Sequence, residues 1–518
     1  MRLNRQSVLY SALLLSLSGF ALQLLGFGYR VLLSRMLTTE GMGVYQLIFP
    51  PFGVMLALTL SGLCVASSRV VAEHSVRGAG GDVRAVVRAC QRMFALLFAA
   101  VALATLLLRG FIANTLVGDE RVEPALLLLL PCLLLTGVEN IYKAVFQGLK
   151  DVRPAALSET GEVAVRIAAV GGLLLAARPK SPGEAAALIV AGMVIAELFS
   201  AGFLSLWYRR LVRRRRMPRG VVTRPMLSQL VRIAAPVTFS GLAMNALSAL
   251  ITVIIPAQLM RSGMTREQAL SRFGVAFGMV SPLLMLPFMF IGPLATVILP
   301  RVSQSMARGK MGDVRRKIAL SVRVTGFIAL PMAAVTAAVG PELCQGIFGH
   351  TLGAGFFLLY AAACVFMYYE VLTGSLLNAM GKQKRNAVYT VVCGVLQVAI
   401  IYCTVAHPRI GLYGYALGLL AGCGLGCVLR FATLRTAAGI HIRPLRWFTL
   451  PLTGALSAGL AARLIYELLG ARHIPPVAGA FAAAGAAAAL YALALPLQGV
   501  RPLRQLRALY GVRREEAV

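Results

Sequence analysis

The sequence has few charged residues, and acidic ones are scarcest. Charged residues make up 14% of the 518 positions, whereas soluble domains usually carry about 25%. Lys and Arg together number 51, but Asp and Glu only 19. Long polar segments are also missing, because the gaps between apolar runs stay below roughly 25 residues. This pattern excludes a sizeable soluble catalytic domain between those runs.

Motifs for nucleotide, metal or covalent chemistry are absent too. There is no GxxxxGK[ST] loop, so we expect no nucleotide-driven activity from this chain. Cys423 and Cys427 share a helix face but have no acidic or histidine neighbour, which argues against zinc. His350, His407 and His473 are isolated. We therefore expect no catalytic residue and no metal centre.

Apolar residues dominate the remaining sequence. They make up 58% of the chain, and the mean hydropathy is +0.78. Runs of about 20 apolar residues, each long enough to cross a bilayer core, recur from Ser7 to Leu497. The sequence therefore predicts an all-α polytopic membrane protein with about fourteen transmembrane helices, at 7–33, 42–68, 86–108, 124–147, 155–177, 184–208, 227–259, 275–300, 316–339, 354–379, 386–406, 411–434, 447–469 and 475–497.

Basic residues lie mostly in alternate gaps between these runs. The same side receives Arg2 and Arg5, the segment WYRRLVRRRRMPRG at 207–220, KQKR at 382–385 and the tail after Arg501. Since loops rich in Lys and Arg stay inside, we expect both termini to be cytoplasmic. The net charge of +32 then faces anionic membrane lipids, and we expect no nucleic-acid partner.

The sequence contains an internal repeat. RGAGGDVR at 77–84 returns as RGKMGDVR at 308–315, and the same offset pairs Pro51 with Pro282 and Glu139 with Glu370. Two copies of a six-helix unit in one orientation indicate a parallel-repeat transporter. The predicted divisions are a first lobe at 1–210, a basic cytoplasmic linker at 211–226, a second lobe at 227–437, two additional helices at 438–498 and a basic cytoplasmic tail at 499–518.

The first seventy residues carry a resemblance to a known family. LLGFGYRVLLSRMLTTEGMGVYQLIFP and LTLSGLCVASSRVVAEH resemble the start of the polysaccharide-transport branch of the multidrug/oligosaccharidyl-lipid/polysaccharide (MOP) flippase superfamily. Within that branch the likeness is greatest to the family of stage V sporulation protein B, and MurJ-type lipid II flippases are more distant. The order of spans, the paired halves and the two extra helices extend the likeness over nearly the whole chain.

The resemblance implies a function. Such a protein moves an undecaprenyl-pyrophosphate-linked saccharide, such as lipid II, from the inner to the outer leaflet of the bacterial cytoplasmic membrane by alternating access. It would be a monomer without a cofactor, coupled to membrane potential, H⁺ or Na⁺, and its partners would be membrane lipids and cell-wall synthesis enzymes. Relatives often show R-x-L-G-x-x-x-R in the first helix, where this chain has Gln23 and Arg30.

Polar residues in or beside the spans are candidates for substrate contact. Arg30 could bind a phosphate with both arms of its guanidinium or snorkel to headgroups. Arg69, at the inner end of the second span, could bind substrate or act as a topological anchor. The remaining amides and hydroxyls could bind sugar or pack between helices. The full candidate set is Gln23, Arg30, Ser68, Arg69, Asn140, Asn245 and Gln397.

Glutamates within the spans are candidates for ion coupling. Glu139 has Lys143 four residues later, a spacing suited to an ion pair, but Glu370 has Gly374 there. Glu370 is therefore the best coupling candidate unless a base on a neighbouring helix pairs with it. Glu197 stands alone in its span and is the third candidate. The stripe of Glu159, Glu162 and Arg166 favours internal neutralisation.

The repeated phrase and the prolines predict structural features. Asp82 and Asp313 follow a glycine and precede a basic helix, where an aspartate can cap free N–H groups. We interpret both segments as elbows between consecutive helices. Prolines inside the apolar runs, such as Pro51, Pro282 and Pro287, predict bends.

Three other functions compete with the flippase. A cation-coupled drug exporter of the same superfamily would need acidic groups facing its cavity, and the cores of the first two spans contain none. A membrane glycosyltransferase or acyltransferase would need a larger outer loop. A scaffold of a cell-wall synthesis complex is the third alternative.

Overall fold

The computed structural model describes residues 8–76, 80–440, 445–471 and 475–496, and the described residues form helices without strands. The predicted anchors Arg2 and Arg5 and the predicted tail at 499–518 lie outside these ranges. The chain divides into two compact units, Met1–Gly274 and Val275–Val518.

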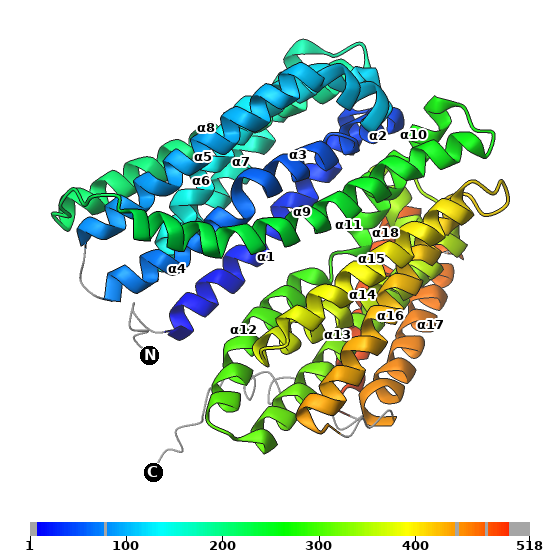
Figure 1. Cartoon of the computed structure of the whole chain (residues 1–518). Coiled ribbons are helices and arrows are strands. Elements are labelled where there is room, and N and C mark those ends of the chain that lie inside the picture. Colours follow the sequence, from blue (N-terminus) through cyan, green and yellow to red (C-terminus); the bar gives the residue numbers. More distant parts are fainter. Residues whose placement is uncertain (1–7, 77–79, 441–444, 472–474, 497–518) are drawn as a thin grey trace. The chain divides into compact units, whose positions relative to one another are not determined.

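The described residues of the first unit form ten α-helices (Figure 1). They are α1 (Val8–Met36), α2 (Thr39–Gln46), α3 (Phe49–Leu56), α4 (Gly62–Val76), α5 (Gly80–Phe111), α6 (Glu123–Gly148), α7 (Arg153–Ala177), α8 (Pro182–Arg214), α9 (Arg224–Arg261) and α10 (Arg266–Gly274). Two π-helical stretches, η1 (Ala57–Ser61) and η2 (Ile112–Val117), and a 3₁₀ turn, η3 (Glu120–Val122), extend these helices.

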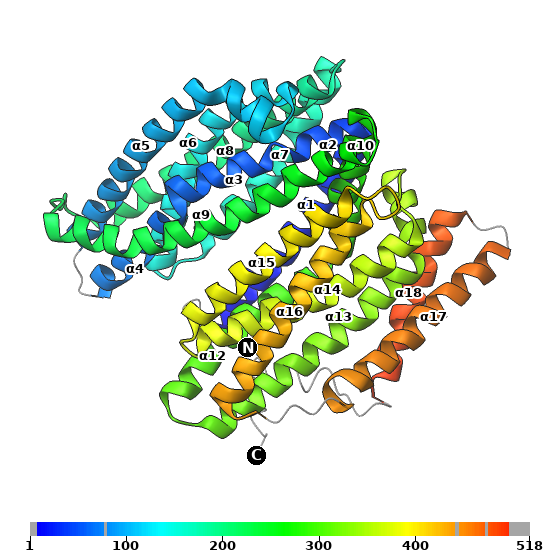
Figure 2. The ribbon, with the colours of Figure 1, turned by 45° about the vertical axis from the view of Figure 1, so that its right-hand side comes forward.

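The second unit holds the remaining helices (Figure 2). They are α11 (Ser281–Leu284), α12 (Phe288–Ala307), α13 (Met311–Phe348), α14 (Ala354–Ala379), α15 (Gln383–Val405), α16 (Tyr413–Ala438), α17 (Leu450–Ala471) and α18 (Pro476–Ala494). Two further π-helical stretches are η4 (Val275–Val280) and η5 (Leu445–Thr449). The last two helices pack on each other and on α13.

The described helices confirm an all-α polytopic membrane protein. Twelve of them are long and apolar enough to cross a bilayer, and each coincides with a predicted span. The two other predicted spans, 7–33 and 275–300, are also helical, but they are not among these twelve. α1 covers the first, and the broken series η4, α11 and α12 covers the second.

Prolines break the second and eighth predicted spans at corresponding places. Pro50 and Pro51 open α3, and Pro282 occupies the same early position in α11. Proline is tolerated there because the first residues of a helix have no intrahelical partner for their N–H groups. Pro287 then precedes the first residue of α12. Each of these spans is therefore divided into several consecutive helical segments.

Helix α9 packs within the first unit, against α3 and α4. The contact is close because Gly62 of α4 lies against the carbonyl of Ala234 and the hydroxyl of Thr238. A side chain at Gly62 would collide with that backbone. The repeat assigns α9 to the second lobe, whereas packing assigns it to the first unit. The lobe boundaries drawn from the repeat therefore stay a prediction.

Two glycines that match in the repeat pack close to each other. Gly43 of α2 lies against the backbone of Leu270, and Gly274 of α10 lies against Thr39 and Gly43. Ser271 Oγ donates to Thr39 Oγ1 at 2.7 Å in the same contact. The backbones of α2 and α10 therefore approach each other closely at both glycines.

Candidate functional site

Helices α6, α7 and α8 pack together and bring buried glutamates to one place. The approach of α7 to α8 is close because Gly192 lies against Val170, where a larger residue would clash. The hydroxyls of Ser158 and Ser200 share a short hydrogen bond across the same interface. Small residues of this kind let membrane helices approach closely.

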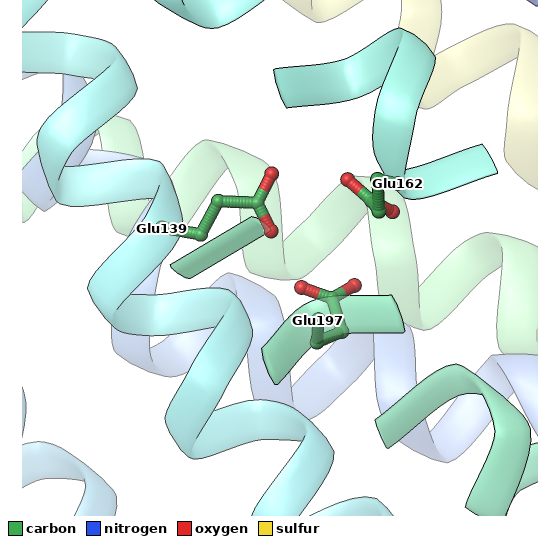
Figure 3. Close-up of side chains that lie close together, drawn as sticks. All are labelled: Glu139, Glu162 and Glu197. Atoms are coloured by element: carbon green, nitrogen blue, oxygen red, sulfur yellow. The ribbon is translucent and has the colours of Figure 1, made fainter. Parts of the chain in front are cut away.

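Glu139 of α6, Glu162 of α7 and Glu197 of α8 form the cluster. Their exposed fractions are 1%, 8% and 5%. One carboxylate oxygen from each residue lies within 4.8 Å of the other two. The three carboxyl groups converge on one small space between the helices (Figure 3). Glu139 and Glu197 were candidates from the sequence, whereas for Glu162 the sequence favoured an internal ion pair over a place in the cavity.

Two cations border the three carboxylates. Lys143 pairs with Glu139, four residues before it, and its Nζ lies 3.8 Å from Glu162 Oε2. Arg166 pairs with Glu162 and lies 3.5 Å from Glu197 Oε1. Both intrahelical pairs follow the spacing that the sequence predicts. The half-exposed Glu159 adds a fourth carboxylate, 3.3 Å from Lys143.

The cluster has more acid than base. Three buried carboxylates face two cations, and among the described residues no donor hydrogen-bonds to the buried Glu197 Oε2. Like charges this close in a membrane interior cannot all remain ionised without a further positive charge. The arrangement is chemically suited to take up a proton or a small cation, for which carboxylates are the usual ligands.

The second unit has a neutral pair at the matching position. Glu370 of α14 corresponds to Glu139 in the repeat, and its Oε1 lies 2.9 Å from Arg430 Nη1 of α16. Arg430 is 2% exposed and also donates to Asn386 Oδ1 and Thr390 Oγ1. Glu370 therefore has the partner on a neighbouring helix that the sequence left as the alternative. The coupling role expected for Glu370 rested on the absence of a cation one turn later in its own helix. Arg430 supplies that cation from another helix, so this argument no longer applies.

The candidates in the first helix are both half-buried. Arg30 and Gln23 lie in α1, and Arg30 forms no hydrogen bond or ion pair with another described residue. The neighbouring Tyr29 is buried, and α1 packs on α7, the helix that carries Glu162 and Arg166. The first helix therefore reaches the rim of the glutamate cluster.

The remaining substrate candidates are dispersed within their helices. Arg69 of α4 is exposed and pairs with Glu73 at 3.5 Å, while its neighbour Ser68 is half-buried. Asn140 donates to the Thr136 carbonyl one turn earlier in α6. Their role in substrate binding stays a prediction.

Two amide candidates lie at helix contacts. Asn245 Oδ1 abuts Gly53 of α3, and its Nδ2 donates to the Gly241 carbonyl. Gln397 of α15 lies against Gly422 of α16. Both amides therefore lie where they would if they packed between helices, the alternative to sugar binding.

The two repeated aspartates link consecutive helices through side chains. Asp82 lies 3.3 Å from His74 Nδ1, and Asp313 accepts from Ser305 Oγ and pairs with Lys317. The N-cap residue of α13 is Lys310, which makes no side-chain capping bond. The capping bond expected from Asp313 is therefore replaced by links to the preceding helix and the following turn. Residues 77–79 of the first phrase lie outside the described ranges.

A second ion network lies between the spans of the first unit. Asp119 is 1% exposed and contacts Arg121 at 2.9 Å and Arg266 at 3.1 Å, while Arg121 also binds Glu40. Burial raises the pKa of the Asp119 carboxyl, but the hydrogen bonds and charges of the two arginines outweigh burial and hold the pKa below its usual range. The network ties α10 to the connection between α5 and α6.

Comparison with solved structures defines the class of this fold. The structure superimposes on an inward-facing multidrug resistance MATE family transporter of the MOP superfamily with a TM-score of 0.67 and 15% identity, over 81% of this chain and 94% of that one. The protein is thus a multi-pass membrane protein with the MOP-superfamily transporter fold. Residues 8–306, more than half of the chain, match the family of polysaccharide biosynthesis proteins, and the chain belongs to that family.

Two relatives from Bacillus subtilis (strain 168) extend over almost the whole chain. Stage V sporulation protein B is 25% identical over 93% of this chain and 94% of its own length. Lipid II flippase MurJ is 23% identical over 89% of each chain. The family resemblance noted in the first seventy residues is confirmed.

Proposed function

We propose that the protein is a flippase that moves an undecaprenyl-pyrophosphate-linked saccharide, lipid II or a related oligosaccharide, from the inner to the outer leaflet. It does so by alternating access in the bacterial cytoplasmic membrane, with both termini cytoplasmic. The match to the polysaccharide biosynthesis family carries this proposal. The likeness to a lipid II flippase and the excess of basic residues, which suits an anionic pyrophosphate, support it.

The proposed energy source is a proton or Na⁺ taken up by the cluster of Glu139, Glu162 and Glu197. Binding one positive charge would neutralise the excess carboxylate, and releasing it would restore the repulsion. The two charge states therefore favour different packings of α6, α7 and α8. A ligand with unequal affinity for two conformations shifts the equilibrium between them, as coupled transport requires.

A cation-coupled drug exporter is the second candidate. The MATE-type fold and the buried carboxylates favour it. The cores of α1 and of the series α2 to α4 contain no Asp or Glu to hold a cationic drug, and Arg30 is a half-buried cation there. The basic composition therefore supports an anionic substrate.

The decisive experiment follows a lipid-linked precursor in cells that lack other flippases for it. Depleting the protein should trap the precursor in the inner leaflet, as measured by its accessibility to an externally added enzyme. Normal outer-leaflet delivery after depletion would remove the proposed function. Unchanged delivery together with increased sensitivity to cationic drugs would favour the exporter.

Substitutions in the same cells test the assigned residues. Arg30→Ala and Glu197→Gln should each slow delivery tenfold or more at normal protein levels, and Glu197→Gln should also abolish its dependence on pH or Na⁺. The controls are Lys180→Ala and Glu267→Gln, which change exposed charges outside the site and should leave the rate within twofold. Full activity of either test variant would remove that residue from its proposed role.

A further inference from the structure

A pocket of about 650 Å³ in the first unit is lined by five arginines and lies away from the glutamate cluster. They are Arg84 of α5, Arg209 and Arg213 of α8, and Arg216 and Arg219 of the segment that leads to α9. The pocket lining contains no Asp or Glu. This concentration of one charge sign needs a physical explanation.

The pocket is held in shape by hydrogen bonds to the backbone. Arg84 Nη1 donates to the Met217 carbonyl at 2.7 Å, and Arg88 donates to the Gly220 carbonyl. Gly220 lies against the carbonyl of Gly81, where a side chain would clash. The segment after α8 is thereby fixed to the first turns of α5. The backbone that carries Arg216 and Arg219 is therefore held in a defined position.

Among the described residues, none of the five guanidinium groups pairs with an acid, and only that of Arg84 has a hydrogen-bond acceptor. Within the described ranges, no carboxylate or hydrogen-bond acceptor pairs with Arg209, Arg213, Arg216 or Arg219. Clustered like charges repel one another and create a strong local positive potential. A bound anion would relieve this repulsion, and the planar guanidinium fork is well matched to phosphate oxygens.

The position of the pocket indicates that the phosphate belongs to a membrane lipid. Two apolar helices that can cross a bilayer, Gly81–Val117 and Pro182–Arg214, meet there at their basic ends. Tyr208 and Met217 are buried in the pocket wall, and Trp207 precedes them. Aromatic residues mark the membrane–water interface, and basic pockets between helices on its inner side accept anionic headgroups.

We propose that this pocket binds the phosphate headgroup of an anionic phospholipid of the inner leaflet. The bound lipid would fasten the connection between α8 and α9 onto α5. The site is separate from the glutamate cluster and does not depend on which saccharide the protein carries.

The test uses the full-length protein in a neutral detergent. Binding of cardiolipin, phosphatidylglycerol and phosphatidylcholine is counted by native mass spectrometry, and inorganic pyrophosphate is added as a soluble competitor. The variant Arg213→Gln/Arg216→Gln/Arg219→Gln removes three exposed pocket charges. The matched control, Lys382→Gln/Lys384→Gln/Arg385→Gln, removes three exposed charges at the start of α15.

The pocket variant should lose at least tenfold in affinity for the two anionic lipids, with a lipid-free melting temperature like that of the wild type. The control should lose less than twofold, and phosphatidylcholine should bind weakly to all three proteins. Equal losses in both variants, or no preference for anionic lipids, would overturn the proposal. Displacement of the lipid by submillimolar pyrophosphate would also overturn it, because the site would then serve a soluble phosphate.

Discussion

Asp119 is the acidic centre of the ion network between α5, α6 and α10. Its carboxylate faces two arginines, and its Oδ1 also accepts from the backbone N–H of Arg121 at 3.0 Å. A buried carboxylate with several donors favours its ionised form. Since the pKa of Asp119 is lower in the folded protein, the network stabilises the fold at neutral pH and weakens in acid.

Replacing Asp119 with Asn should therefore destabilise the protein in a pH-dependent way. The expected loss is about 1–3 kcal/mol at pH 7, because the arginines lose their ionised acceptor. The stabilisation is complete above the unfolded pKa of about 3.9 and disappears as the pH falls through the lower folded value. The melting temperatures of the wild type and the variant, measured between pH 3 and pH 7, should therefore converge as the pH falls. Glu120→Gln, at an exposed neighbour, is the control; an equal deficit at pH 3 and pH 7 would contradict the mechanism.

At the glutamates, the sequence predicted contacts within one helix better than contacts between helices. The pairs Glu139–Lys143 and Glu162–Arg166 follow from a four-residue spacing and are present. The pair Glu370–Arg430 joins α14 to α16, so no local spacing reveals it. The cluster of three glutamates was missed for the same reason, although the excess of acids over bases in the fourth to sixth spans was a usable signal.

At the scale of elements, glycines decide how closely helices approach. Gly43 and Gly274 allow the backbones of α2 and α10 to touch. A methyl group at Gly43 would meet the Leu270 carbonyl, which is backbone and cannot turn away. The contact therefore depends on the absence of a side chain, as in other close helix pairs in membranes.

Gly43→Ala should separate α2 from α10 and lower stability by about 1–3 kcal/mol, the usual cost of overpacking. Gly172→Ala is the control, because nothing lies within 4 Å of the added methyl group in α7. That substitution should leave the protein unchanged or stabilise it by about 0.5–1 kcal/mol through helix propensity. Thermal unfolding in detergent measures both changes, and equal melting temperatures would refute the packing argument.

The order of helices was predictable from the sequence, but their grouping was not. Apolar length and proline positions predicted the spans and the breaks at Pro51 and Pro282, because both depend on local chemistry. The packing of α9 on α3 and α4 depends on Gly62 meeting the backbone near Ala234, a contact between distant segments. An internal repeat identifies related segments of the sequence, but it does not determine which helices pack against each other.

At the scale of the whole molecule, the distribution of basic residues predicts how the chain crosses the membrane. The segment at 207–220 and the loop around Gly309 carry clustered arginines, whereas the connection around Lys180 carries few charges. The positive-inside rule predicts that the first two are cytoplasmic and that the third faces outward. The proposed direction of transport and the proposed lipid pocket both require this orientation.

Reporter insertions test the orientation directly. Alkaline phosphatase, which is active only outside the cytoplasm, should be active after Lys180 and inactive after Gly309, and green fluorescent protein should give the opposite result. Both insertion points lie in short connections between helices, so the helices themselves stay intact. The reverse pattern would place the arginine pocket at the outer surface and contradict the inner-leaflet site. The same side for both insertions would contradict the predicted number of spans between them, because an odd number of crossings must separate opposite faces.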